Sequence, residues 1–310
     1  MTEQSRRAQL AAIAGMVTAG ASWGLAAVMA KTAFDRGVAP VRMAEARAVV
    51  ALAVLGGILA WRRRDLVRPP PGSVLILIAF GLSVAGVNST YYIAIDRLAV
   101  GVAISLQYTA PVLLLGWAAV TVRGRATGRV VWLAAGLTLA GAVLVSRAYG
   151  GLGRVNGIGL LAAVGSALTF ATYLLTAGRA GRRGIQPSTV LFWGFVVAVL
   201  TWSVIAPWWS WPVGRLADIK VTLSVLGVGI VGTLIPFFLA VGALRVLQPA
   251  VAGIAATVEP PFAAAFAWLF LGQHLSLLQI AGGILVLAGV VLAQRTAAVI
   301  PEALAVEPVS

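Results

Sequence analysis

The chain has 310 residues, of which 60% are hydrophobic and only 10% are charged, and its mean hydropathy is +0.98. A soluble domain has about 25% charged residues, so this composition excludes an ordinary soluble protein and indicates a membrane protein. The formal charge is +14, but Lys and Arg stand in short clusters between apolar blocks, which favours membrane loops over nucleic-acid binding. With no Cys and His274 as the sole His, we predict no metal site and no cofactor.

Apolar blocks of about 18–24 residues, the length of a bilayer-spanning helix, follow one another along the chain. The first block is too long for a signal-peptide core and lacks an A-x-A site, so we predict that it stays as a span. We therefore expect an all-α integral membrane protein with ten transmembrane helices. They cover residues 10–30, 43–61, 73–94, 98–121, 130–147, 156–178, 188–209, 221–243, 249–271 and 276–294.

Basic residues predict the orientation of these spans. If the N-terminus is cytoplasmic, the inner segments hold fourteen of the 23 Lys and Arg residues, with Arg clusters at 62–68, 123–129 and 179–183. Cytoplasmic loops of membrane proteins carry an excess of Lys and Arg. We therefore expect residues 1–9 and 296–310 to be cytoplasmic tails, with both termini inside.

The two halves of the chain resemble each other. "RGVAP" (36–40) matches "RGIQP" (183–187), and "AGAVLVSR" (140–147) matches "AGVVLAQR" (288–295), at offsets of 147 and 148. "YYIA" (91–94) and "FFLA" (237–240) match at 146, and "TAP" (109–111) and "VEP" (258–260) at 149. Ser22-Trp23 falls on Thr169-Phe170 at 147. Ordered matches at nearly one offset predict two five-helix repeats, over 10–147 and 156–295. Because five is odd, the second repeat enters the membrane inverted, as in many secondary transporters.

An acid and two prolines interrupt the ninth span, in "VEPPF" (258–262). Glu259 lies about 15 Å into the span, near the middle of a hydrocarbon core about 30 Å thick. Pro260 and its match Pro111 lie at similar depth, and a proline frees the carbonyl four residues earlier. The acid and the freed carbonyls predict a polar cavity between the repeats. The alternatives are packing kinks at the prolines and a structural carboxyl held neutral by a neighbour.

Other polar and aromatic side chains are candidates for the same cavity. The stretches "NSTYY" (88–92) and "QYTAP" (107–111) bring polar groups into spans three and four. Trp23 and Tyr173 could enclose a solute, although packing alone also accounts for aromatic residues in a membrane helix. The predicted substrate-binding or coupling residues are Glu259, Pro260, Pro111, Tyr108, Gln107, Asn88, Trp23, Tyr173, Arg47 and Glu45.

A charged cluster opens the second span, in "VRMAEARAVV" (41–50). Arg42 and Glu45 are three residues apart and can pair on one helix face. Arg47 reaches deepest, and it could bind a carboxylate, gate the outer mouth, or extend its guanidinium to the membrane surface.

Four stretches together resemble the drug/metabolite transporter superfamily, in particular its ten-span EamA-type members with two EamA domains. They are "ASWGLAAVMAK" (21–31), "RGVAPVRMAEARAVVAL" (36–52), "YYIAIDRLAVGVAISLQYTAPV" (91–112) and "VEPPFAAAFAWLFLGQHLS" (258–276). The resemblance implies a secondary transporter, often an exporter of amino acids, metabolites or drugs, in the bacterial inner membrane. The halves differ at the two charged positions. Gly194 is the repeat equivalent of Arg47, and Ala110 is the repeat equivalent of Glu259.

We therefore predict a transporter of a small solute and not an enzyme, with protons as the candidate coupling ion and a monomer or homodimer in the lipid. The runner-up is a membrane-embedded lipid-modifying enzyme. It would need paired acids at one depth, whereas Glu45 and Glu259 differ in depth. A third interpretation, the permease subunit of an ATP-driven pump, requires a partner chain because no G-x-x-x-x-G-K-[ST] motif occurs.

Overall fold

The computed structural model describes residues 3–110, 129–146, 156–247 and 255–299, which form helices, turns and loops without a strand. The first half contributes α1 (Glu3–Phe34), α2 (Pro40–Arg62), η1 (Arg64–Val67), α3 (Val74–Arg97), α4 (Val100–Gln107) and α6 (Arg129–Ser146). The second contributes α7 (Gly157–Arg182), α8 (Pro187–Ile205), η4 (Trp208–Ser210), η5 (Val213–Ala217), α9 (Ile219–Gly229), η6 (Ile230–Leu234), α10 (Ile235–Ala243), α12 (Glu259–Leu271) and α13 (Leu277–Val299). The predicted all-α class is confirmed.

Among the described residues, six helices are long and apolar enough to cross a membrane. They are Arg6–Phe34, Pro40–Arg62, Val74–Arg97, Gly157–Arg182, Pro187–Ile205 and the continuous run Ile219–Ala243. Shorter apolar helices cover Trp132–Val145, Glu259–Leu271 and Leu277–Leu292. Pro111, the rest of span four and the start of span nine at 249–254 lie outside the described residues.

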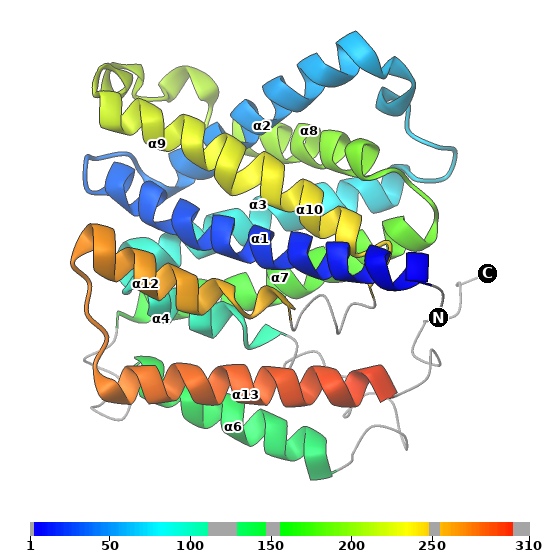
Figure 1. The fold of residues 1–310 in the computed structure, drawn as a ribbon. Helices are drawn as coiled ribbons and strands as arrows, with labels where there is room; N and C mark the ends of the chain where they lie inside the picture. The colour runs from blue at the N-terminus through cyan, green and yellow to red at the C-terminus, as the bar shows by residue number, and fades with distance from the viewer. Residues whose placement is uncertain (1–2, 111–128, 147–155, 248–254, 300–310) are drawn as a thin grey trace.

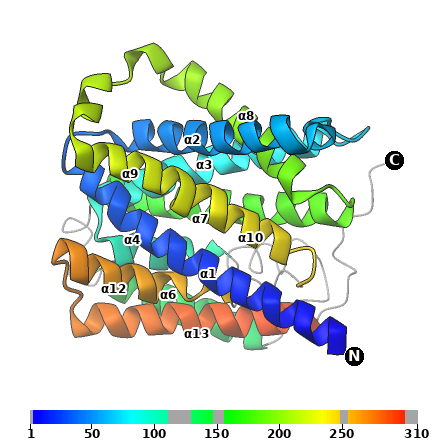
Figure 2. The same cartoon turned by 45° about the horizontal axis from the view of Figure 1, so that its top comes forward.

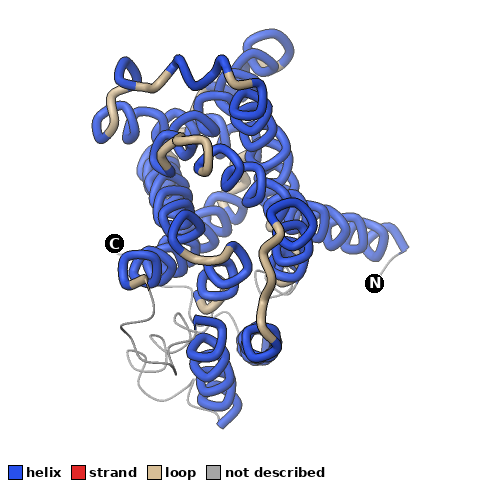
Figure 3. Tube along the Cα trace, turned by 90° about the vertical axis from the view of Figure 1, so that its left-hand side faces the viewer, coloured by secondary structure: helices blue, strands red, loops and turns tan. Residues whose placement is uncertain are grey.

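Packing between the halves follows an inverted repeat. Helix α3 packs on α7 and α8, and correspondingly the α9–α10 run packs on α1 and α9 on α2. Helix α4 packs on α7, as α12 packs on α1, while α4 pairs with α12 and α6 with α13. Figures 1 and 2 show the α6–α13 pair along one edge of the bundle. The first turn of α1 and the last turn of α13 lie at the same end of the bundle (Figure 1). Figure 3 looks nearly along many of the helices.

The motif shared by residues 36–40 and 183–187 folds in the same way in both halves. Gly37 and Gly184 have φ of +84° and +70°, a conformation that favours glycine after the end of a helix. Three residues later, Pro40 and Pro187 begin α2 and α8, where a missing N–H costs nothing. The matching residues of the two halves therefore form the same kind of turn before α2 and α8.

Three of the predicted spans depart from a regular α-helix, two of them at turns and the third at a π-helical turn. Helix α4 ends at Gln107 and is followed by a turn at residues 108–109, and α12 begins at Glu259 after a turn at 257–258. Span eight, expected as one helix over 221–243, contains a π-helical turn at η6 between α9 and α10. Such π-turns are frequent at functional sites. Pro236 follows this turn directly, which explains part of the irregularity.

Helix α1 covers the break in span nine through two glycines. A Cβ atom at Gly20 would lie 2.9 Å from Val258 Cγ2, and one at Gly24 would lie 2.8 Å from the backbone nitrogen of Ala263. The stretch "GASWG" (20–24) therefore serves close helix packing. Without side chains at these two positions, α1 approaches the backbone of the first turn of α12.

Candidate functional site

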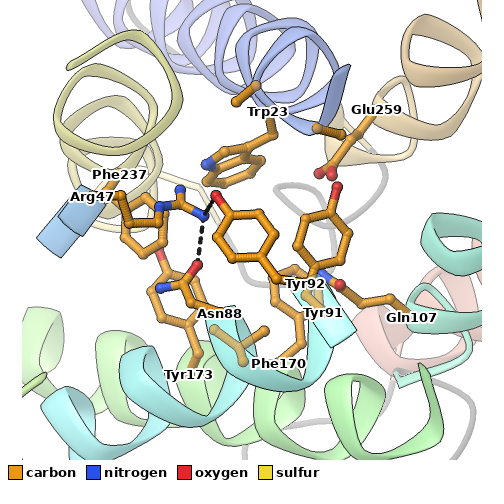
Figure 4. A pocket seen from close by; sticks show the side chains of 13 residues that line it. Trp23, Arg47, Asn88, Tyr91, Tyr92, Gln107, Phe170, Tyr173, Phe237 and Glu259 are labelled. Carbon is orange, nitrogen blue, oxygen red and sulfur yellow. Dashed lines mark hydrogen bonds between the residues drawn. The ribbon is translucent and has the colours of Figure 1, made fainter. Parts of the chain in front are cut away.

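A cavity lies between the repeats. Six of the ten predicted site residues line it, namely Trp23, Arg47, Asn88, Gln107, Tyr173 and Glu259 (Figure 4). The remaining lining residues are Ala26, Ala27, Val87, Tyr91, Tyr92, Phe170 and Phe237. Helices α1, α2, α3 and α4 of the first repeat and α7, α10 and α12 of the second all contribute.

The aromatic wall of the cavity follows the internal repeat. Trp23 and Phe170 are equivalent at an offset of 147, and Tyr91 and Phe237 at 146, and all four line the cavity. Phe170 and Phe237 were not predicted as site residues. The internal repeat could have identified them. A residue at the position equivalent to a cavity residue faces the same pseudo-symmetry axis from the other repeat.

Arg47 is buried, with 3% of its surface exposed, and its guanidinium uses four of its five N–H donors. Nη1 donates to Asn88 Oδ1 at 2.7 Å and to the Tyr92 hydroxyl at 2.6 Å. Nε donates to Thr233 Oγ1 at 2.7 Å, and Nη2 to the Gly232 carbonyl at 2.5 Å. Two of these bonds appear in Figure 4. Arg47 therefore holds α2 to α3 and to η6 and does not extend toward the membrane surface.

The Gly232 carbonyl is available to Arg47 because of Pro236. A proline has no N–H for the carbonyl four residues earlier, which here is Gly232. The π-turn also redirects Thr233, whose hydroxyl donates to the Val228 carbonyl five residues earlier at 2.6 Å. The irregular backbone of span eight thus presents acceptors to a cation from the other repeat.

Glu259 lies at the opposite wall, 4% exposed, at the first residue of α12. The Tyr108 hydroxyl lies 2.8 Å from Glu259 Oε2 and 2.9 Å from the Ala256 carbonyl oxygen. Pro260 frees this carbonyl, so a second freed carbonyl is bound by a side chain of the other repeat. In Figure 4 the Tyr91 side chain also points toward Glu259, although the two are not hydrogen-bonded.

Three polar atoms in the cavity wall have no hydrogen-bond partner among the described residues. They are Trp23 Nε1 and the hydroxyls of Tyr91 and Tyr173. Buried polar groups are nearly always paired, so unpaired ones call for an explanation. Here all three line one cavity that also holds a guanidinium and a carboxyl group. The wall is therefore suited to a small polar solute with several hydrogen-bonding groups.

The other predicted residues lie beside the cavity or away from it. Tyr108 and Pro260 are buried next to Glu259 and do not line the cavity. Gln107, which does line it, accepts a 2.7 Å hydrogen bond at its amide oxygen from Ser166. Glu45 is buried elsewhere, at a mainly apolar pocket between α2, α9 and the loop before α9. It pairs with Arg42 at 3.0 Å, as predicted from their spacing.

No group of three His, Asp or Glu side chains in the described part of the chain could hold a metal ion. In these residues, His274 stands in the short loop between α12 and α13, away from the cavity. The chemistry that the cavity offers is therefore binding and charge balance.

The sequence model of the EamA-like transporter family matches the chain twice, at residues 10–147 and 157–294. Threonine/homoserine exporters RhtA of Salmonella typhimurium (strain SL1344) and Escherichia coli (strain K12) are 27% identical over 211 residues, 66% of this chain. The match covers 66% of either exporter, slightly under two thirds of its length. An uncharacterized transporter of Archaeoglobus fulgidus is 27% identical over 77% of this chain and 82% of its own. One crystal structure, 19% identical, shares the fold with a TM-score of 0.62 over 96% of this chain and 99% of that chain.

Proposed function

Since the chain belongs to the EamA-like transporter family, and is thus a multi-pass membrane transporter and not an enzyme, we propose that it exports a small zwitterionic solute of the amino-acid class. Transport proceeds by alternating access of the cavity between the two repeats, over 10–147 and 156–295. One observation carries the proposal: a single cavity holds one guanidinium, one carboxyl group and three unpartnered polar atoms. The names of the threonine/homoserine exporters support the same solute class.

The positions of the charges suggest how a zwitterion would lie. The solute ammonium faces Glu259, the one acid among the described residues of the cavity wall. The solute carboxylate lies in the field of Arg47 and accepts from the unpartnered Trp23 Nε1 and the Tyr173 hydroxyl. Because four donors of Arg47 are already used within the protein, the guanidinium acts mainly through its charge. Aromatic faces at Phe170 and Phe237 enclose the rest of a small solute.

Glu259 is the exchangeable charge of this proposed mechanism. A carboxylate at membrane depth needs a balancing cation, and it has no salt bridge among the described residues. A proton or the ammonium of the solute can balance it in turn. Exchange of one for the other couples proton movement to solute release and drives export without ATP.

The experiment that tests the proposal replaces Glu259 by Gln, which keeps the shape and removes the charge. We expect proteoliposomes with Glu259→Gln to lose the dependence of threonine or homoserine transport on pH between about 5 and 8, with the protein still folded and inserted. Glu45→Gln is the matched control, because Glu45 is equally buried but lies outside the cavity. Its pH profile should match that of the unchanged protein. A wild-type profile in Glu259→Gln would make Glu259 a structural acid.

For orientation, we propose that both termini are cytoplasmic, in a bacterial inner membrane. The Arg-rich loops at 62–68 and 179–183 support this orientation. Because the chain has no cysteine, a cysteine introduced at Arg63 can be labelled without background. It should resist an impermeant thiol reagent added outside intact cells, whereas a cysteine at Arg215 should react. Labelling in the reverse pattern contradicts the orientation.

A further inference from the structure

The Tyr108 hydroxyl has two acceptors and one proton. Its oxygen lies 2.9 Å from the Ala256 carbonyl oxygen and 2.8 Å from Glu259 Oε2. A tyrosine hydroxyl donates one hydrogen bond, whereas a carbonyl and an ionised carboxylate can only accept. If Glu259 is ionised, one of the two contacts therefore holds no proton. If Glu259 is protonated, both contacts are satisfied, because the carboxyl donates to Tyr108 and Tyr108 donates to Ala256.

The carbonyl in this arrangement lies at the break in span nine. Ala256 precedes the turn at residues 257–258, and Pro260 removes the N–H that would otherwise reach its carbonyl. Tyr108 and Ala256 are each 1% exposed, so the hydroxyl is the donor on which this carbonyl depends. A buried carbonyl without a donor is costly, above all at membrane depth.

Tyr108 also crosses the boundary between the repeats. It directly follows α4 of the first repeat, at the turn where that helix stops, whereas Ala256 and Glu259 belong to the second. The one hydroxyl therefore touches a titratable group and a broken backbone on the opposite side of the pseudo-symmetric interface.

We propose that Tyr108 is a positioning residue that couples the protonation of Glu259 to the break in span nine, an inference that rests on the proposed function of Glu259. When the carboxyl proton leaves to cavity water, the Tyr108 hydroxyl turns its hydrogen to the carboxylate, since a charge-assisted bond is stronger. The Ala256 carbonyl then loses its donor, and the backbone at 257–258 is released from α4. Return of the proton to Glu259 restores both hydrogen bonds and again ties the Ala256 carbonyl to Tyr108.

Other groups that face Glu259 do not share this position. Arg47 of α2 is held by its own four hydrogen bonds, and Tyr91, Tyr92 and Tyr173 come from α3 and α7. The lining residues of α1 and α10 are not titratable. In the described part of the chain, Tyr108 makes the one hydrogen bond to the Glu259 carboxyl group.

Tyr108→Phe tests the coupling, because it removes the hydroxyl and keeps the ring. In proteoliposomes we expect the midpoint of the transport pH profile to move by about one pH unit or more, the effect of losing a hydrogen bond to a charged group. The infrared carbonyl band of the protonated Glu259, identified by its loss in Glu259→Gln, should also shift. Ser105→Ala removes another buried hydroxyl of α4, which donates to the Gly101 carbonyl and lies outside the cavity, and it should leave both the midpoint and the band in place.

The outcomes separate this inference from the proposed function. A Tyr108→Phe protein with the wild-type midpoint and an unshifted band overturns the coupling, even if Glu259→Gln abolishes the pH dependence. A Glu259→Gln protein with a wild-type profile overturns the proposed function itself. If Tyr108→Phe does not fold, a fluorotyrosine at position 108 keeps the ring and hydroxyl but makes a stronger donor. It must then move the midpoint, and an unchanged midpoint contradicts the proposal.

Discussion

The two repeats share their packing but differ in the charge that each brings to the cavity. The first supplies Arg47, where the second has Gly194, and the second supplies Glu259, where the first has Ala110. Gly194 has a structural reason, because a Cβ there would lie 2.5 Å from the Phe80 ring. The third span of each repeat is also different, since span eight has the π-turn whereas α3 is continuous.

Each charge is bound by the other repeat. Arg47 of the first repeat donates to Thr233 and Gly232 of the second, and Glu259 of the second is bound by Tyr108 of the first. In both cases a proline in span eight or nine frees the carbonyl that takes part. The comparison teaches that divergence of the repeats put the fixed cation and the exchangeable acid on opposite walls, each anchored across the interface.

The largest effect is expected when the fixed cation is removed. Arg47→Met leaves four buried acceptors without their donor, and each orphaned group costs about 1–3 kcal/mol, so the free energy of unfolding should fall by about 3 kcal/mol or more. Thermal unfolding in detergent, followed by tryptophan fluorescence, measures the loss. Arg62→Met at the C-terminal end of the same helix is the control, since that guanidinium lies over the exposed Trp61 ring. Equal melting temperatures for the two variants would contradict the anchoring role of Arg47.

A smaller effect on stability, but a clear effect on transport, is expected from the prolines. Pro260→Ala restores a backbone N–H that competes with Tyr108 for the Ala256 carbonyl. Pro236→Ala likewise restores a backbone N–H that competes with Arg47 for the Gly232 carbonyl. Because both prolines lie in the first turn of their helices, where proline is tolerated, stability should change little while the transport rate falls several-fold.

We propose Pro111, which lies outside the described residues, as the partner of Pro260 beside the solute path, so Pro111→Ala should act likewise. Proteoliposome flux at matched protein levels provides the measurement for all three variants. Normal flux in all of them would leave the prolines with a packing role only.

The smallest effect is expected at the surface, where the repeats meet again. Arg36 lies 3.4 Å from Asp218, with side-chain exposures of 32% and 43%. Such exposed pairs contribute about 0.2–1 kcal/mol and weaken with salt. Asp218→Asn keeps the cap on the Lys220 N–H and should lower the melting temperature by a few degrees at most, with the difference vanishing in high salt.

The equivalent of Arg36 in the second repeat is the control for that measurement. Arg183 donates to the Gly72 carbonyl at 3.1 Å and faces no carboxylate there. Arg183→Gln should therefore change stability by an amount that does not depend on salt. A salt-dependent change at Arg183 and none at Asp218 would reverse the comparison.

The fold and half of the site could be predicted because charged residues and prolines are rare within apolar spans and are easily recognised in the sequence. Glu259 and Pro260 stand out in an apolar span, and Glu259 lines the cavity while Pro260 is buried beside it. The depth of Arg47 could not be predicted, since the same residue in the first turns of a span can face inward or reach the surface. Nor could the π-turn, because glycines are so frequent in this chain that Gly229 and Gly232 carry no signal. Glu45 was predicted as a site residue, but it pairs with Arg42 at a separate pocket outside the cavity.

The presence of one fixed cation and one titratable acid in the same cavity has an electrical consequence. Among the described residues, Arg47 and Glu259 are the only charged ones that line it. With Glu259 ionised, the two charges cancel, and a carrier that changes its open side moves no net charge through the membrane potential. With Glu259 protonated, one positive charge moves with the cavity, and a full crossing costs or releases about 2.3 kcal/mol per 100 mV. The protonation state of one carboxyl group thus decides whether voltage can drive the return of the carrier.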